Sequence, residues 1–498
     1  MKNIVVVGGG TAGWITALMV QAYHPYFHVT VIESEEIGIL GAGEGTVPHF
    51  VSVLDIIGIP FTDIVKYASG TVKNGIRFVN WNGDGKEYFH GFNPSKGLGV
   101  LEDFELILHH LTKENNFNNF NLANLCSKEK KVPFSYKNIQ SYRSNLNALG
   151  YFQNYQNWAM HFNAKELAAF LRSVAEYRGI NRIEDKVVEI ISAEDGKIVS
   201  LKTDKGQLIS LDFVFDCSGF ARLIVGKHFK TNWISYSQHL PMDTAVPFFI
   251  DHSNNVEPET KAIAMKYGWA WQIPVQDRYG CGYVFDSSYI NEEQALSEAE
   301  DFFNQKLVSP KTFRFNPGTY SKTLVKNCLA VGLSQSFVEP LEATSLWVSF
   351  SNLIDFLNSR GLLIDTVVLE ESFNKRCLKV NSEVVDFLSF HYMTKRQDSS
   401  FWREFSQKNI ITDSVAETIN LLKHDPLATI DKINFLNSAW LQVGFGLEIL
   451  IKNRYFDIIR LVNEEMIKQS YEQCRFNLNN VVKSCVAHKE FLEVLKNI

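Results

Sequence analysis

A glycine-rich segment near the amino end of the chain has the residue types and the spacing of a dinucleotide cradle. Gly8, Gly10 and Gly13 directly follow the apolar run 4–7 and precede a helical pattern over residues 14–22. This is G-x-G-x-x-G between a strand and a helix: the first glycine permits a tight turn, the second lets a pyrophosphate approach the backbone, and the third lets the helix lie close to the strand. We therefore expect a dinucleotide, with its phosphates at the amino end of the helix.

A second predicted strand, residues 28–32, ends in Glu33, about 20 residues past the last glycine, where a carboxylate is expected to hydrogen-bond the adenosine ribose. A glycine turn that serves packing alone is the alternative. Two later apolar strands, 213–219 and 328–333, are followed by a helix that begins near Thr344. The chain is thus expected to return to the dinucleotide site late in the sequence, with a strand, a glycine and a helix. This organisation is typical of two-part flavoproteins, whose nucleotide fold is split by a substrate region, and it favours FAD over NAD.

A second candidate element is the hexapeptide 269–274, Trp-Ala-Trp-Gln-Ile-Pro. Trp269 and Trp271 lie on the same face of an extended strand, and Pro274 lacks the N–H that would continue the ladder. Taken alone, two such rings fill a core. Beside a nucleotide cradle, they point to a flavin enzyme that acts on aromatics.

Composition narrows the remaining choices. The 498 residues suffice for two closely packed regions or for one large α/β unit with an elaboration. A net charge of −6 without a basic stripe argues against nucleic acid. The longest apolar stretch, 435–451, contains Asn437, Gln442 and Glu448, so no membrane span is expected. The first strand leaves no room for a signal peptide, which predicts a cytoplasmic protein. Seven cysteines without a C-x-x-C favour reduced thiols over disulfides or zinc, and no metal is expected.

These features together resemble the flavin-dependent tryptophan halogenases and their relatives. Besides the cradle and the hexapeptide, the resemblance is carried by residues 43–48 (GEGTVP), 73–78 (KNGIRF), 216–220 (DCSGF), 337–342 (FVEPLE), and His391 and Tyr392 before 396–398 (RQD). It implies an α/β fold of the FAD-binding Rossmann type (GR2-like, in two parts), with a substrate region and a mainly helical C-terminal cap.

The predicted division places residues 1–350 in an FAD-binding module with an inserted sheet and a discontinuous nucleotide fold. Residues 351–498 form the helical cap on the substrate side. Apolar residues at spacings of three and four support helices over 363–373, 384–390, 415–422 and 458–467.

The resemblance also implies an activity. A separate flavin reductase supplies reduced FAD, which with oxygen and chloride, bromide or iodide gives hypohalous acid. The acid passes through an internal tunnel and halogenates an indole or another electron-rich aromatic, either free or bound to a carrier. An FAD-dependent aromatic monooxygenase and a degenerate, non-catalytic flavoprotein are the alternatives, and a homo-oligomer is left open.

Lys73 and Glu342 are the catalytic candidates that the resemblance implies. Lys73 lies in an alternating, strand-like stretch, 71–79, where a lysine usually occupies a solvated strand edge. The resemblance instead implies that it binds hypohalous acid, either as an ammonium donor or as a neutral amine that forms a haloamine. Its partner Glu342 would polarise the oxidant or accept the ring proton. Glu339 could be a helix-start acid.

The resemblance assigns further roles. The implied FAD-binding residues are Gly8, Gly10, Thr11, Ala12, Gly13, Glu33, Val187, Leu333 and Leu346. The implied tunnel wall consists of Trp269, Trp271, Ile273 and Pro274. Backbone N–H groups of Thr344 and Ser345 would bind halide, and Trp440 would face the substrate, with helix packing as its alternative. Ala343 departs from the serine that many relatives carry, and His391 and Tyr392 are interpreted as a structural helix end.

Overall fold

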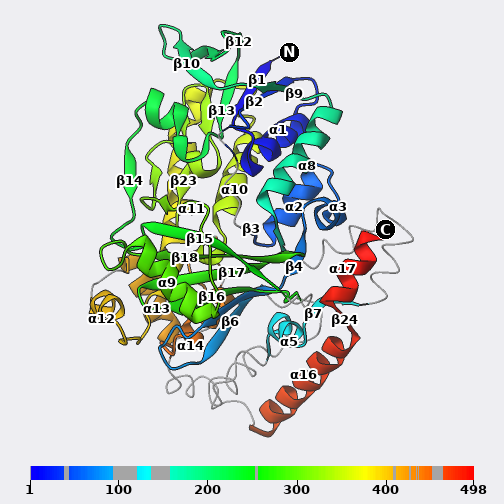
Figure 1. The fold of residues 1–498 in the computed structure, drawn as a ribbon, viewed down its shortest axis with the longest axis vertical. Coiled ribbons are helices and arrows are strands. Elements are labelled where there is room, and N and C mark those ends of the chain that lie inside the picture. The colour runs from blue at the N-terminus through cyan, green and yellow to red at the C-terminus, as the bar shows by residue number, and fades with distance from the viewer. Residues whose placement is uncertain are drawn as a thin grey trace.

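The computed structural model describes residues 2–36, 38, 44–92, 120–135, 158–252, 256–407, 411–424, 428–432, 434–435, 437–450 and 464–497. Its amino-terminal part is built on a six-stranded sheet (Figure 1). In spatial order the strands are β21 (Leu324–Val325), β22 (Cys328–Ala330), β13 (Phe213–Asp216), β1 (Asn3–Val7), β2 (His28–Glu33) and β9 (Asn181–Glu184). All neighbours pair in parallel except β21 and β22. The predicted late return of the chain to the nucleotide sheet is therefore confirmed.

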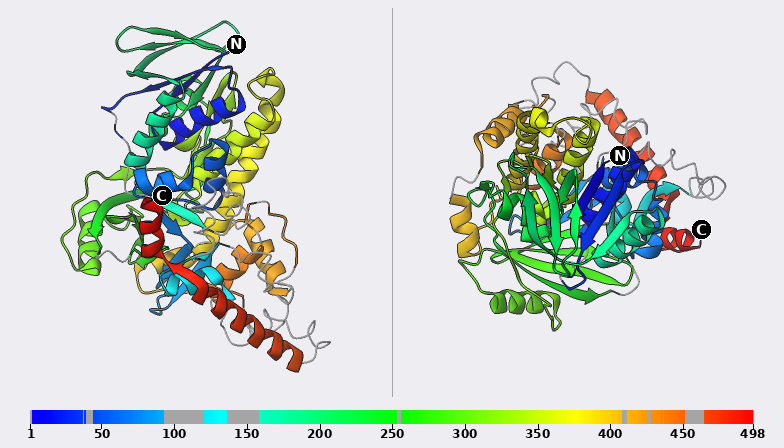
Figure 2. Two further views of the ribbon diagram at one scale, coloured as in Figure 1. Left: turned by 90° about the vertical axis from the view of Figure 1, so that its right-hand side faces the viewer. Right: turned by 90° about the horizontal axis from the view of Figure 1, so that it is seen from above.

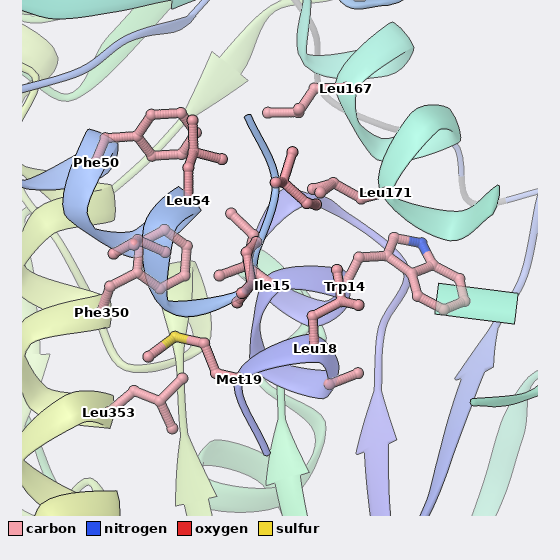
Figure 3. Close-up of a cluster of buried hydrophobic side chains, with 14 of the residues drawn as sticks. Trp14, Ile15, Leu18, Met19, Phe50, Leu54, Leu167, Leu171, Phe350 and Leu353 are labelled. Carbon is pink, nitrogen blue, oxygen red and sulfur yellow. The ribbon is translucent and has the colours of Figure 1, made fainter. Parts of the chain in front are cut away.

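Helix α1 (Thr11–Tyr23) lies at the centre of the first core. It packs against α2 (His49–Ile56), α8 (Ala164–Tyr177) and α10 (Ser345–Asn358), as Figure 3 shows. The contacting side chains include Trp14, Ile15, Leu18, Met19, Phe50, Leu54, Leu167, Leu171, Phe350 and Leu353. Because these side chains are close-packed, α1 has little room to shift, and its amino end is held in place against the sheet.

A seven-stranded sheet crosses the middle of the molecule (Figure 1). Its spatial order is β19 (Phe313–Arg314), β15 (Thr244–Asp251), β18 (Arg278–Phe285), β17 (Gly268–Pro274), β16 (Thr260–Met265), β5 (Gly75–Val79) and β6 (Glu87–Gly91). Only the β16–β5 pair is parallel. One face of this sheet packs on α9 (Glu292–Phe303), and the other carries Trp269 into the core shared with the C-terminal helices.

The C-terminal part is mainly helical, as predicted. Its helices are α11 (Thr366–His391), α12 (Ser400–Gln407), α13 (Asp413–His424), α14 (Asn437–Gly446), α16 (Glu464–Ser484) and α17 (His488–Lys496). The helices predicted over 363–373 and 384–390 belong to one continuous helix, because no proline or glycine interrupts α11; residues 363–365 precede it. Helix α13 contains 415–422. Of the predicted helix 458–467, residues 458–463 lie outside the described residues, and the rest begins α16, the long red helix of Figure 2.

Two small sheets are formed by segments that lie far apart in the sequence. One consists of β3 (Glu44–Gly45), β8 (Ala159–Phe162) and β4 (Thr71–Lys73), and another pairs β7 (Lys131–Ser135) with β24 (Cys485–Ala487). The prediction of one alternating strand over 71–79 is wrong. The chain turns at Asn74, so β4 and β5 join different sheets, and residues 71–78 are all buried because both faces are covered.

The remaining described elements are shorter. They are β10 (Val187–Ser192), β11 (Ile198–Thr203), β12 (Leu208–Ser210), β14 (Trp233–Ser235), β20 (Gly318–Tyr320), β23 (Ser336–Phe337), α3 (Phe61–Tyr67), α5 (Leu122–Lys128), and the turns η3 (Gly219–Ala221), η4 (Leu223–His228), η5 (Gly332–Ser334) and η6 (Pro340–Glu342). None of the helices in the described part of the chain is long and apolar enough to cross a membrane. The division between 1–350 and 351–498 stays a prediction.

Candidate active site

The glycine cradle lies between the end of β1 and the start of α1. Gly8 has φ +121°, and a Cβ added there would overlap the carbonyl oxygen of Cys217. A Cβ on Gly13 would overlap the carbonyl oxygen of Gly8. By contrast, no atom of the described chain lies within 4 Å of a Cβ built on Gly10. Gly8 and Gly13 thus serve the close approach of strand, turn and helix, whereas Gly10 faces open space.

The amino end of α1 suits an anionic group. Gly10 is its N-cap and supplies no side-chain hydrogen bond, so the first N–H groups of the helix remain available. Thr11 Oγ1 is buried and has no hydrogen-bond partner among the described residues. Ala12 lies next to η5, since a Cβ on Gly332 would stand 2.8 Å from the Ala12 Cβ. An orphan hydroxyl beside uncapped amides fits a dinucleotide pyrophosphate.

Glu33 ends β2 beside this cradle. Its Oε1 accepts a hydrogen bond from Arg182 Nε at 2.6 Å, and its Oε2 lies so close to Gly9 that an added Cβ would overlap it. The carboxylate is thereby held at the cradle, although part of its charge is already paired. Its predicted contact with a ribose stays a prediction.

The other predicted FAD-binding residues come from three elements. Val187 begins β10 and packs against the core on the outer face of the nucleotide sheet, while Leu333 lies in η5. Leu346, in the first turn of α10, lines a cavity of about 230 Å³ between α2 and α10. Thr46, Val47 and Phe50 are among the other residues that line it.

Lys73 is the last residue of β4 and is 0% exposed. Its Nζ donates a hydrogen bond to the carbonyl oxygen of Thr46 at 3.0 Å and lies 5.4 Å from the ring centre of Phe92. Burial lowers the pKa of Lys73 to about 7, while the charge of Glu342 acts to raise it. The interpretation of Lys73 as a solvated strand-edge residue is wrong, because β8 and the segment around Thr46 cover it.

Both neighbours of Lys73 are held from distant parts of the chain. The backbone N–H of Val72 donates to His488 Nε2 at 3.0 Å, and His488 Nδ1 lies 2.9 Å from the carbonyl oxygen of Val256. Asn74 Nδ2 donates to Ser127 Oγ at 3.1 Å and to the Lys131 carbonyl oxygen at 3.0 Å. Helices α17 and α5 therefore fix the backbone that presents the amine.

Glu342 ends the short turn η6 and is 2% exposed. Its Oε1 lies 2.9 Å from His90 Nδ1 and 2.9 Å from His391 Nε2. Burial opposes ionisation, but the charge of His90, its hydrogen bond and the close contact of His391 lower the pKa of Glu342 to about 2. Among the described residues, Glu342 and Lys73 form no direct ion pair and influence each other through space.

The predicted halide groups follow at once. Thr344 is the N-cap of α10, Ser345 begins the helix, and Thr344 Oγ1 is buried without a partner in the described part of the chain. Ala343 has φ +55°, the left-handed conformation, and turns the chain from η6 into α10. The uncapped amino end of a 14-residue helix suits a small anion.

The hexapeptide forms β17, and its two tryptophans lie on one face, as predicted. Their ring centres are 6.3 Å apart. Trp269 is 1% exposed, and its Nε1 donates to Tyr392 Oη at 3.1 Å, while Tyr392 in turn donates to Glu339. Ile273 and Pro274 are buried at the end of the strand. Glu339 does stand at the start of η6, as interpreted, but its carboxylate accepts hydrogen bonds in this buried network and does not cap the turn.

Trp440 lies within α14 and is 0% exposed. Its ring packs on Phe387 and Phe390 of α11, at centre distances of 5.3 and 4.9 Å. Two residues on, Gln442 accepts from the Gly91 N–H at 2.9 Å and donates to the Gly91 carbonyl at 3.2 Å. Helix α14 thus holds the end of β6, and the substrate role of Trp440 stays a prediction.

Sequence reasoning missed His90 and His488 and gave His391 only a structural role. His391 and Tyr392 do end α11, as interpreted, but both also contact buried carboxylates. His90 and His488 gave no signal, because each lies in an ordinary strand or helix pattern far from its partner in sequence. In the described part of the chain, no cluster of three or more side chains could hold a metal ion.

Comparison with known proteins decides the family. The sequence model of the family described as tryptophan halogenase matches residues 3–460 of the 498. This chain belongs to the tryptophan halogenase family. It is 31% identical over 454 residues to tryptophan 7-halogenase RebH of Lentzea aerocolonigenes, across 85% of this chain and 82% of RebH. It is 29% identical over 450 residues to tryptophan 6-halogenase ThaL of Streptomyces albogriseolus, across 84% and 81%.

Solved structures agree with this assignment. Xcc4156, a flavin-dependent halogenase from Xanthomonas campestris, is similar with a TM-score of 0.89 at 26% identity, covering 99% of this chain and 98% of that one. BrvH, a flavin-dependent halogenase from Brevundimonas sp. BAL3, gives a TM-score of 0.86 at 26% identity and 99% coverage of both chains. The predicted α/β flavoprotein fold is confirmed.

The family also confirms the predicted class of activity. This tryptophan halogenase family member is a flavin-dependent halogenase, an oxidoreductase that uses FADH2 with a halide ion as co-substrate. Halogenases of this kind need a separate flavin reductase and an aromatic substrate.

Proposed function

We propose that this halogenase transfers halogen to an indole or another electron-rich aromatic. In this proposal, Lys73 binds hypohalous acid, and Glu342 stabilises the cationic ring and accepts its proton. Reduced FAD, with oxygen and halide, supplies the hypohalous acid. The names of RebH and ThaL, which are tryptophan halogenases, support an indole as the first substrate class to test. Both free and carrier-bound aromatics remain within the proposal.

The observation that carries this proposal is a fully buried amine whose pKa is about 7. Near neutral pH, Lys73 is present both as an ammonium group and as a free amine. The ammonium group donates a hydrogen bond to hypohalous acid and increases its electrophilicity. The free amine attacks the halogen instead, which gives an N–halogen bond and releases water. An exposed lysine, charged at this pH, could offer only the first route.

Glu342 supplies a negative charge on the other side of the site. Because its pKa is about 2, it is ionised throughout the neutral range. A carboxylate in a buried site stabilises the cationic ring that forms when halogen adds, and it accepts the ring proton as aromaticity returns. That step breaks the ring C–H bond and leaves neutral Glu342 beside the halogenated product.

Further residues have supporting roles in the proposal. The cradle glycines, with Thr11, Ala12 and Glu33, would hold the FAD dinucleotide, and Val187, Leu333 and Leu346 would contact it. The N–H groups of Thr344 and Ser345 would bind the halide, while Trp269, Trp271, Ile273 and Pro274 would line the tunnel and Trp440 the substrate side. The described cysteines are all buried and free, which supports action in the reducing cytoplasm.

Replacement of Lys73 tests the proposal directly. Purified protein with FAD, NADH, a flavin reductase and bromide is offered a panel of indoles and phenols, and products are identified by mass spectrometry. Wild type should add bromine. Lys73→Met, which fills the buried site with an apolar chain, should lose at least about 10³-fold in product formation while FAD binding and oxygen consumption persist; each tenfold loss is about 1.4 kcal/mol.

The matched control is Lys86→Met, since that lysine side chain is 73% exposed and should leave activity unchanged. Normal bromination by folded Lys73→Met protein would contradict the assigned role. A wild-type product that gains oxygen instead of bromine would indicate a monooxygenase, and no product from any aromatic would indicate a degenerate flavoprotein.

A further inference from the structure

The carboxylate of Glu342 lies between two imidazole rings. His90 Nδ1 is 2.9 Å from Oε1 and 3.0 Å from Oε2, so one ring nitrogen spans both oxygens. His391 Nε2 lies 2.9 Å from Oε1, an ion-pair distance, but its angle is outside that of a hydrogen bond. All three side chains are buried. Since an ionised carboxylate only accepts hydrogen bonds, His90 must present its Nδ1–H to it, and His391 adds a close electrostatic contact.

Tyr88 fixes which nitrogen of His391 carries the proton. Its hydroxyl oxygen is 3.2 Å from His391 Nδ1. Burial raises the pKa of Tyr88 well above its usual value, so the phenol keeps its proton and donates it to Nδ1. The ring proton of neutral His391 then lies on Nε2, the nitrogen 2.9 Å from Glu342 Oε1. Stacking on Phe78, with ring centres 4.6 Å apart, holds the plane of the imidazole.

Glu339 provides a comparison within the same turn. Both carboxylates are fully buried and only three residues apart. Burial raises the pKa of Glu339 to about 7, although Tyr392, Trp269 and the Met242 N–H act to lower it, whereas the pKa of Glu342 is lowered to about 2. The two sites differ in their donors: Glu339 has a phenol, an indole and a backbone N–H, and Glu342 has two imidazoles. The imidazoles therefore keep Glu342 charged where burial alone would neutralise it.

We propose that His90, His391 and Tyr88 form a positioning chain that keeps Glu342 ionised and oriented during halogen transfer. This inference rests on the proposed function of Glu342. The chain joins β6, which carries Tyr88 and His90, to the last residue of α11 and to the turn η6. The positioning chain thereby gives Glu342 a permanent negative charge that stabilises the cationic ring, but it makes the carboxylate a weaker base. The proton that Glu342 accepts is therefore weakly held and leaves readily after each turnover.

Several charged and titratable groups lie around Glu342, and the test must separate their pH dependence from that of Glu342. Lys73 faces it from β4, His90 and Tyr88 from β6, and His391 from α11, while Glu339 shares its turn. Because Lys73 itself titrates near pH 7, each variant is compared with wild type at the same pH. Any additional pH dependence then belongs to Glu342.

The first experiment measures kcat/KM for bromination from pH 5.5 to 8.5. In His90→Phe and His391→Phe, the pKa of Glu342 should rise toward that of Glu339, so activity relative to wild type should fall about tenfold from pH 8 to pH 6. His90→Asn and His391→Gln keep a donor near Nδ1 and near Nε2, respectively, and should show a smaller fall, as should Tyr88→Phe. His228→Phe is the control, because His228 contacts Ser192 and is not part of the positioning chain; it should show no fall in activity.

A second readout does not require activity. In His391→Phe, a Glu342 with a raised pKa makes the fold less stable as pH increases from about 5 to 7, and the midpoint of thermal unfolding should fall relative to wild type. This slope should vanish in the His391→Phe, Glu342→Gln double variant.

The two ideas fail in different ways. A wild-type protein that brominates nothing refutes the proposed function, and the unfolding slope still tests the positioning chain. Conversely, normal wild-type bromination with the same activity loss at every pH in the Phe variants, and an unchanged slope in the double variant, would overturn the positioning chain. The histidines would then only fill space.

Discussion

The nucleotide cradle and the Lys73–Glu342 site are built in opposite ways. The cradle is one short stretch, in which Gly8 and Gly13 are required because backbone atoms of Cys217 and Gly8 occupy the space of a side chain. The other site joins residues that are far apart in sequence: 252 positions separate His90 from Glu342, and 416 separate Val72 from His488. A contiguous motif can be recognised by its spacing, whereas an assembled site has none.

Their electrostatics differ as well. In the described part of the chain, the helix of the cradle has no side-chain cap at its amino end, which suits an anion that comes from solvent. The second site buries its own charges, which moves the pKa of Lys73 down to about 7 and leaves Glu342 charged only because imidazoles surround it. Substitutions in the cradle should therefore act on folding and FAD binding, and those around Glu342 on chemistry and pH dependence.

The largest effect on stability is expected at the cradle. Gly8→Ala should destabilise the apoprotein by about 3 kcal/mol or more, because a Cβ overlaps a backbone carbonyl at a positive φ. Gly10→Ala is the matched variant: its Cβ meets open space, so stability should change by less than about 0.5 kcal/mol. It should still weaken FAD binding at least about tenfold, because the pyrophosphate needs that space. Urea unfolding measures the change in stability, and flavin fluorescence titration measures FAD binding. Equal effects of Gly8→Ala and Gly10→Ala on both quantities would contradict the different roles assigned to the two glycines.

Glu342→Gln should act on chemistry alone. The amide keeps the shape but removes the charge and the proton acceptor, so kcat for halogenation should fall about 10²-fold, which corresponds to about 2.7 kcal/mol. FAD binding and oxygen consumption should remain. Single-turnover product formation, measured beside oxygen uptake, checks this. Loss of oxygen uptake would mean instead that the turn supports the flavin site.

Glu339→Gln should change how stability depends on pH. The folded pKa of Glu339, about 7, lies above its ordinary value of 4.5, so its contribution is complete below pH 4.5 and is lost as pH rises through 7. Wild type should therefore lose stability between pH 4.5 and 7 relative to Glu339→Gln. The melting temperatures of both proteins across this range test the sign. A constant difference would show that Glu339 does not titrate there.

The smallest effects are expected at Ala343. Its φ of +55° costs an alanine about 1 kcal/mol, so Ala343→Gly should stabilise the fold by about 0.5 kcal/mol after the entropy of glycine is included. Ala343→Ser restores the common family residue and should change halogenation by less than about threefold or shift substrate preference. Thermal unfolding and the aromatic panel measure these changes. A tenfold gain in the serine variant would mean that the missing hydroxyl limits wild type.

Much of the fold could be predicted from local pattern. The runs that form β1, β13 and β22 are recognisable because buried parallel strands are almost continuously apolar. The stretch 71–79 is misinterpreted from its alternating pattern, because residues 71–78 are all buried and the chain passes from one sheet to another at Asn74. Helix α11 was divided in two, because its polar middle hid a continuous helix.

The amino-acid sequence by itself determined the nucleotide cradle, the strand with both tryptophans on one face, and the resemblance that identified Lys73 and Glu342. These depend on neighbours in the chain, whose geometry follows from backbone sterics and strand period. Only the tertiary structure decided that Lys73 is buried, that Glu339 and Glu342 have opposite pKa shifts, and that His90, His391 and His488 belong to the site. Desolvation and hydrogen bonding depend on which distant side chains meet, and that is settled only when the chain has folded.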